Sequence, residues 1–199
     1  MNNNDISKKG YRTAFSATAL FGGVQVFTII IQIFKSKVVA LWLGVSGFGV
    51  LSLFNAATSL IFTISNLGLQ SSAVRDIANA QANQDISLVS RIVKAINRWV
   101  VLTGMFGALI TIALSPWLSK WLFESNEYTI SFILLSVVVL MTCIYSGNYA
   151  LLQGTRNLKF MAKANIFGAL AGFLISLPFF YFLREEGIVW ALILTAIST

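Results

Sequence analysis

The chain has 199 residues, of which 57% are hydrophobic and 11% are charged, and its mean hydropathy is +0.79. A soluble domain carries about 25% charged residues, so this composition excludes one and indicates an integral membrane protein. The formal net charge is +7, but the sequence leaves no extramembrane domain to hold a basic reading surface. We therefore expect no nucleic-acid partner.

Long uncharged runs alternate with short charged segments along the chain. A helix that crosses a bilayer needs roughly 20 apolar residues, which predicts an all-α bundle of six transmembrane helices. These helices are expected near residues 13–43, 47–68, 97–115, 129–151, 164–183 and 187–199. Residues 1–12 would form an N-terminal segment, residues 13–199 the bundle, and residues 70–97 a linker within it. The sixth run is shorter than a full span, so we expect the chain to end inside a helix.

The lysines and arginines are unevenly shared between the two predicted sides of the membrane. One side holds Lys8, Lys9, Arg12, Arg75, Arg91, Lys94, Arg98, Arg156, Lys159 and Lys163. The other side holds Lys35, Lys37, Lys120 and Arg184. Cytoplasmic segments carry the excess of cations in most membrane proteins, so this asymmetry predicts a cytoplasmic N-terminus.

The first helix carries one polar stripe through its apolar surface. Residues three, four and seven apart share a helix face, and the stripe that obeys this spacing is Thr18, Gly22, Gln25, Thr28, Gln32 and Lys35. Lys37 lies two positions further on and points roughly 200° away from Lys35. The two lysines therefore cannot face one cavity unless the helix bends between them.

A charged side chain in the membrane costs about 2.5–3.5 kcal/mol at the helix centre, so it persists where it lines a wet cavity, meets a partner or reaches the headgroups. One interpretation places Lys35 in a central aqueous cavity, with Lys37 reaching toward the headgroups or another helix. The alternative ends the first span at Phe34 and places both lysines at the outer headgroups. The sequence leaves both interpretations open.

A Gly-rich segment, residues 43–49, divides the first two helices and favours a tight turn. The second helix then presents a further polar stripe. Its members are Ser52, Asn55, Ser59 and Asn66, with Thr63 beside them. Such side chains either line a cavity or hydrogen-bond to a neighbouring helix.

The linker after the second helix contains an amphipathic pattern. Ile86, Val89, Val93 and Ile96 fall on one side, and Arg91, Lys94 and Arg98 fall opposite, with Asp85 as a possible cap. This pattern predicts a helix that lies at the cytoplasmic interface, with its cations on lipid phosphates or simply in solvent. Membrane lipids are thus expected partners.

The later helices combine small packing residues with a few larger polar ones. The third helix has Gly104, Ala108, Thr111 and Ser115 on one face and is expected to end near Pro116. Small residues let helix backbones approach one another, so this face is predicted to pack. The fourth helix carries Tyr145 and Tyr149, which either contact sugar rings beside a cavity or make interhelical hydrogen bonds. Cys143 is the single cysteine, which excludes an intrachain disulfide.

Two segments carry a resemblance to a known family. A turn of the form Leu-Gly-x-x-Gly-aromatic-Gly precedes a polar helix that closes on Leu67-Gly68-Leu69 and is followed by Val74-Arg75-Asp76. Together with residues 153–160, this pattern resembles the polysaccharide and O-antigen flippases of the multidrug/oligosaccharidyl-lipid/polysaccharide exporter superfamily. The spacing of all six helices agrees, so the resemblance covers nearly the whole chain. The family has twelve to fourteen helices in two related bundles, of which this chain would supply one.

The resemblance implies a transporter in the bacterial inner membrane and not an enzyme, with no cofactor. Its cargo would be a lipid-linked oligosaccharide on undecaprenyl diphosphate, and its partner a second six-helix bundle. The candidate cavity residues are Lys35, Gln25, Gln32, Asn55, Ser59 and Asn66. Secondary candidates are Lys37, Arg75, Tyr145 and Tyr149.

Two other functions fit the same sequence. An ion-coupled multidrug exporter of the superfamily would share the topology, but we would expect a carboxylate inside its membrane spans, and every Asp and Glu lies outside the predicted ones. A truncated half would act only as an assembly subunit without transport.

Overall fold

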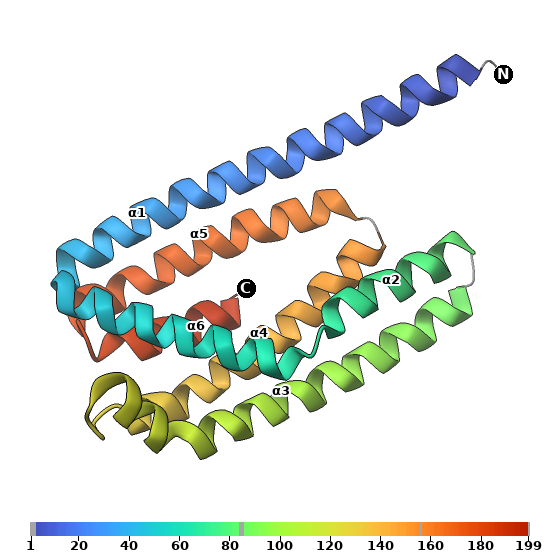
Figure 1. Cartoon of the computed structure of the whole chain (residues 1–199). Helices are drawn as coiled ribbons and strands as arrows, with labels where there is room; N and C mark the ends of the chain where they lie inside the picture. The colour runs from blue at the N-terminus through green and yellow to red at the C-terminus, as the bar shows by residue number, and fades with distance from the viewer. Residues whose placement is uncertain (1–2, 84–85, 156, 199) are drawn as a thin grey trace.

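The computed structural model describes residues 3–83, 86–155 and 157–198, and its side chains from Gly22 onward except that of Ile86. The described chain is all helical. In order, the helices are α1 (Asn3–Asn66), α2 (Leu69–Ala82), α3 (Ile86–Phe123), α4 (Thr129–Gly154), α5 (Leu158–Phe182) and α6 (Gly187–Ser198). Figure 1 shows them as one elongated bundle, which confirms the all-α prediction. The side chain of Thr18 in the first polar stripe, Asp85 and Arg156 lie outside the described part.

Helix α1 reverses direction at Gly44. Its backbone there has φ 71° and ψ −172°, a conformation that is open almost only to glycine. We call residues 3–43 the first limb and residues 45–66 the second limb; in Figure 1 the two limbs run back on each other from this point. The predicted turn is therefore confirmed, and one residue of the Gly-rich segment makes it.

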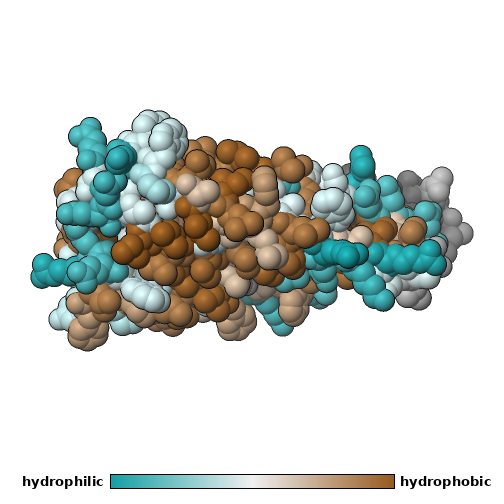
Figure 2. All heavy atoms as spheres, turned by 90° about the horizontal axis from the view of Figure 1, so that it is seen from below, coloured by the Kyte–Doolittle hydropathy of each residue, from teal (hydrophilic) through white to brown (hydrophobic). Residues whose placement is uncertain are grey.

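Four helices are long and apolar enough to cross a membrane. They are Gly22–Asn66, Ser87–Phe123, Thr129–Gly154 and Leu158–Phe182, and α6 is a shorter apolar helix. The first of them contains residues 22–43 of the first limb and the whole second limb, each long enough for its own crossing. Figure 2 shows a broad apolar surface between two hydrophilic ends. The chain is thus a membrane protein.

The two ends of the bundle differ in charge. We call the end with Gly44 and the loops after α3 and α5 the turn end, and the end with α2 and the α4–α5 loop the linker end. Four of the described acids, Glu124, Glu127, Glu185 and Glu186, follow α3 or α5 at the turn end. Most described cations lie at the linker end: Arg75, Arg91, Lys94, Arg98, Lys159 and Lys163. This arrangement agrees with the predicted alternation of loops; which end faces the cytoplasm stays a prediction.

The linker forms differently from the prediction. The amphipathic segment at Arg91 and Arg98 is the beginning of α3 and continues into the membrane span as one helix of 38 residues. It is therefore not a separate helix, and its position at the cytoplasmic interface stays a prediction. The predicted sidedness holds, because Ile96 is buried whereas Arg91, Lys94 and Arg98 are exposed.

Helix α3 also continues past Pro116, where the sequence pattern predicted its end. A proline has no N–H to donate to the carbonyl four residues earlier, here that of Ile112. The Ser115 hydroxyl donates to this oxygen at 2.8 Å and so satisfies it. The prediction of a helix end was therefore wrong, and α3 runs on to Phe123.

Close packing of small residues holds the bundle together. Gly104, Thr111 and Ser115 are buried, which confirms the predicted packing face of α3. A Cβ on Gly104 would lie 3.2 Å from Cβ of Cys143, so α3 and α4 approach closely there. Toward the turn end, the rings of Phe54 and Phe132 meet edge to face at 5.3 Å in the main core.

Candidate functional site

A cavity of about 320 Å³ opens between the second limb of α1, α4 and α6. We call it the central cavity. Asn55, Thr58, Ser59 and Phe62 line it from the second limb, Val138 and Thr142 from α4, and Leu192, Thr195 and Ala196 from α6. The predicted candidates Asn55 and Ser59 thus share one cavity wall.

The threonines of the central cavity are hydrogen-bonded within their own helices. Thr58 donates to the Phe54 carbonyl at 2.8 Å, Thr142 to that of Val138 at 2.7 Å, and Thr195 to that of Ala191 at 2.8 Å. The hydroxyl oxygens of Thr58 and Thr142 keep lone pairs that can accept a hydrogen bond. The cavity therefore offers neutral acceptors together with the amide of Asn55 and the hydroxyl of Ser59.

A second cavity, of about 410 Å³, lies at the junction of α1 and α2. We call it the linker-end cavity. It is lined by Asn66, Gly68, Gln70, Ser71, Val74 and Gln153. The predicted candidate Asn66 thus belongs to this cavity and not to the one that holds Asn55.

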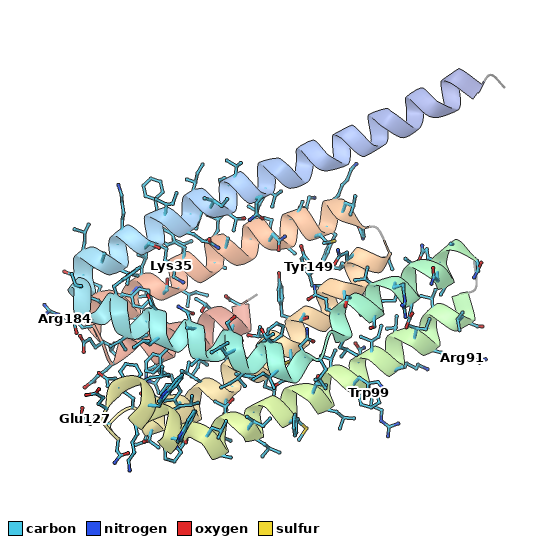
Figure 3. All side chains as sticks on the ribbon, in the orientation of Figure 1. Lys35, Arg91, Trp99, Glu127, Tyr149 and Arg184 are labelled. Carbon is cyan, nitrogen blue, oxygen red and sulfur yellow. The ribbon has the colours of Figure 1, made fainter. Side chains whose placement is uncertain are left out.

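One face of α4 runs from the central cavity to the linker-end cavity. Thr142, Tyr145, Tyr149 and Gln153 share this face because they are spaced by three or four residues. The Tyr145 hydroxyl donates to Oδ1 of Asn165 at 3.1 Å, and Nδ2 of Asn165 donates to the Tyr149 hydroxyl oxygen at 3.3 Å. The tyrosine rings lie 5.7 Å apart, and Figure 3 shows Tyr149 on the side of α4 that faces α5. The two tyrosines therefore make interhelical hydrogen bonds, which was one of the two alternatives that the sequence left open.

Lys35 lies on the packing face of the first limb. This face also holds Val24, Thr28 and Val39, of which the two valines are buried. Lys35 is itself half-buried, and Figure 3 places it on the inner side of the limb, beside α5. It has no hydrogen bond or ion pair with the described residues, whose one ion pair joins Arg75 and Asp76.

The level of Lys35 can be estimated from the helix rise. At 1.5 Å per residue, Lys35 lies about 14 Å from the reversal at Gly44 and Asn55 about 16 Å from it. Trp42, whose ring meets that of Tyr181 at 5.4 Å, lies about 10 Å nearer the turn end than Lys35. Lys35 and Asn55 therefore lie at similar distances from the turn end, and the depth of Lys35 in the membrane stays a prediction.

The remaining sequence candidates are dispersed. Gln25, Gln32 and Lys37 are exposed on the first limb, and the side chain of Arg75 is 75% exposed on α2. Lys35, Gln25 and Gln32 therefore do not line either of the two cavities, and their role in binding stays a prediction. Within the described part of the chain, no group of three His, Cys, Asp or Glu residues is placed to hold a metal ion.

Several cavity residues were not predicted from the sequence. Thr58 lies three residues after Asn55 on the same stripe and could have been found by its spacing. Gln70 and Ser71 begin α2, and Thr195 belongs to α6. No periodicity within one helix could assign these three to a cavity, because their neighbours come from other helices.

Comparison with known proteins identifies the family. A family model described as polysaccharide biosynthesis protein matches residues 38–199, which include every residue that lines the two cavities. No curated protein and no solved structure matches the chain. The matched part is most of the 199 residues, and it confirms the predicted resemblance at the level of the family. The chain therefore belongs to the polysaccharide biosynthesis protein family.

Proposed function

We propose that the protein flips a lipid-linked oligosaccharide across the bacterial inner membrane, with the N-terminus in the cytoplasm. Membership of the polysaccharide biosynthesis protein family indicates a role in polysaccharide synthesis or export. The observation that supports the finer proposal is the central cavity, where Asn55 and Thr142 place an amide and a hydroxyl near the middle of two long apolar helices, the second limb and α4. Flipping makes and breaks no covalent bond, so under this proposal the protein is not an enzyme.

The cargo sets the chemistry that such a path must supply. Sugar hydroxyls both donate and accept hydrogen bonds, so neutral amides and hydroxyls suit them. The diphosphate that joins sugar to lipid is anionic, and an unpaired cation inside the membrane is a natural partner for it. Asn55 and Ser59 would hold sugar, and Lys35 would pair with the diphosphate while the prenyl tail stays in the lipid.

The complete path would need a second wall. In the proposed mechanism a second six-helix bundle packs against this one, and the two rock between inward-open and outward-open states. Lys35, Gln25 and Gln32 would then line the space between bundles, which accounts for their position outside the cavities within this one.

Replacing Lys35 by alanine tests the proposal. A hydrogen bond to a charged group contributes about 1.5–3 kcal/mol, so losing it should weaken cargo binding about 10- to 100-fold. We expect cells that carry Lys35→Ala to display much less surface polysaccharide at an unchanged level of the protein in the membrane. Lys35→Arg keeps the charge and should retain most export.

Lys37→Ala is the matched control, because Lys37 is exposed on the other side of the same limb and should be dispensable. Normal export by Lys35→Ala would disprove the role of Lys35. Equal losses in Lys35→Ala and Lys37→Ala would show a general effect of charge near the turn end and not binding of a diphosphate.

A further inference from the structure

The linker-end cavity has no part in the proposed role of Lys35. It lies where the second limb ends, between the first turn of α2 and the last turn of α4. We propose that this cavity is a separate binding site for one neutral sugar residue. The identity of the ligand rests on the proposed function, but the site and its test do not require transport.

The lining supplies the hydrogen-bonding groups that a sugar uses. Three carboxamides, those of Asn66, Gln70 and Gln153, and the hydroxyl of Ser71 surround the cavity. A carboxamide offers two donor hydrogens and an acceptor oxygen, and a sugar hydroxyl is complementary to both. The volume of 410 Å³ falls within the range of small-molecule sites.

Most of these groups are available to a ligand. The side chains of Asn66 and Gln153 make no hydrogen bond with the described residues, although Asn66 is half-buried. The hydroxyl of buried Ser146 donates to Oε1 of Gln70 at 3.2 Å, which orients that amide and leaves its NH2 group free. The Ser71 hydroxyl donates to the Gly68 carbonyl at 2.8 Å and keeps its acceptor lone pairs.

The backbone holds the cavity open. Leu67 and Gly68 both have left-handed conformations, with φ 45° and 72°, so the chain bends sharply between α1 and α2. On the opposite wall, a Cβ on Gly154 would lie 2.7 Å from Cβ of Ile77, which means that α2 is pressed directly onto α4. Because the cluster around Ile77 is buried, close packing fixes the position of α2 relative to α4 beside the cavity.

The charge of the lining selects a neutral ligand over a phosphate. Among the residues that the structure describes, no charged side chain lines the cavity. The neighbouring Arg75 points into solvent and pairs with Asp76 at 3.4 Å. A free anion would find amides there but no cation from the described part of the chain, whereas a sugar requires none.

Protection of an engineered thiol tests the site in the purified full chain. Cys143 is the single cysteine and is buried, so Ser71→Cys introduces one accessible thiol inside the cavity. Ser72→Cys, on the next and exposed residue outside it, is the matched control. A water-soluble maleimide would label each variant in the presence of glucose or N-acetylglucosamine up to about 0.1 M, which covers millimolar dissociation constants.

We expect at least one sugar to slow labelling of Ser71→Cys twofold or more and to leave Ser72→Cys unchanged, with inorganic phosphate slowing neither. Adding Gln153→Ala should abolish the protection, whereas Gln81→Ala at the exposed end of α2 and Lys35→Ala should retain it. Unchanged labelling with both sugars, or equal protection by phosphate, overturns the inference. The two proposals can fail separately. If Lys35→Ala exports polysaccharide normally while sugar still protects Ser71→Cys, the role of Lys35 is disproved and the sugar site is retained.

Discussion

The reversal at Gly44 makes a strong quantitative prediction about stability. A side chain at φ 71° and ψ −172° strains the backbone by about 1–3 kcal/mol. A Cβ built on Gly44 meets no atom within 4 Å, so Gly44→Ala adds no steric clash to this strain. We therefore expect Gly44→Ala to lower the free energy of unfolding by about 1–3 kcal/mol.

Gly49→Ala is the internal control for this prediction. Gly49 lies five residues later in the second limb and has helical geometry, and a Cβ on it would also meet no atom within 4 Å. Alanine in a helix is more stable than glycine by about 0.5–1 kcal/mol, so this variant should gain stability. The two variants should thus differ by about 1.5–4 kcal/mol.

The measurement is equilibrium unfolding of the purified protein in mild detergent by added sodium dodecyl sulfate, followed by helical circular dichroism. Gly44→Ala should unfold at a lower fraction of dodecyl sulfate than the wild type, and Gly49→Ala at an equal or higher one. If Gly44→Ala is as stable as Gly49→Ala, the backbone at residue 44 does not carry the reversal and the two-limb description of α1 fails.

Two further predictions use the same unfolding measurement. Ser65→Ala should raise stability by about 1 kcal/mol, because the Ser65 hydroxyl is fully buried without a hydrogen-bond partner among the described residues; a loss of stability would show that the hydroxyl has a role. Burial raises the pKa of the Tyr128 phenol above its ordinary 10.0, and the nearby Glu185 and Glu127 raise it further. The folded state therefore favours the neutral phenol, whose contribution is complete below pH 10 and is lost as the pH rises through the raised pKa. Tyr128→Phe should lose less stability than the wild type above pH 10, and parallel pH profiles would contradict this assignment.

The sequence predicted the parts of the fold that depend on one helix at a time. Helical phase separated Lys35 from Lys37, and the structure indeed has the first half-buried and the second exposed. The helix end at Pro116 failed because the compensating hydroxyl of Ser115 is a side-chain effect that a rule for proline ignores.

The candidate site was harder to predict because a cavity belongs to several helices. The structure divides the predicted stripe of the second limb, with Asn55 in one cavity, Asn66 in the other and Ser52 in neither of the two. The bend at Leu67 and Gly68 brings α2 to the end of the stripe and so creates the second cavity. No spacing in the sequence specifies the direction of that bend.

The threonine hydroxyls of the central cavity and the ammonium group of Lys35 differ in the free energy that each costs when no ligand is bound. Thr58 and Thr142 donate within their own helices, so neither of these hydroxyl donors is left unpaired when the central cavity holds no ligand. Lys35 has no such internal partner among the described residues, and an unpaired cation at depth costs a few kcal/mol, roughly. A transporter must release its cargo in every cycle, which favours cavity groups that are stable when empty, such as these two hydroxyls beside Asn55 and Ser59. The cation gains more from binding than the hydroxyls do, so under the proposed function the diphosphate, and not the sugar, would supply most of the energy that distinguishes the loaded state from the empty one.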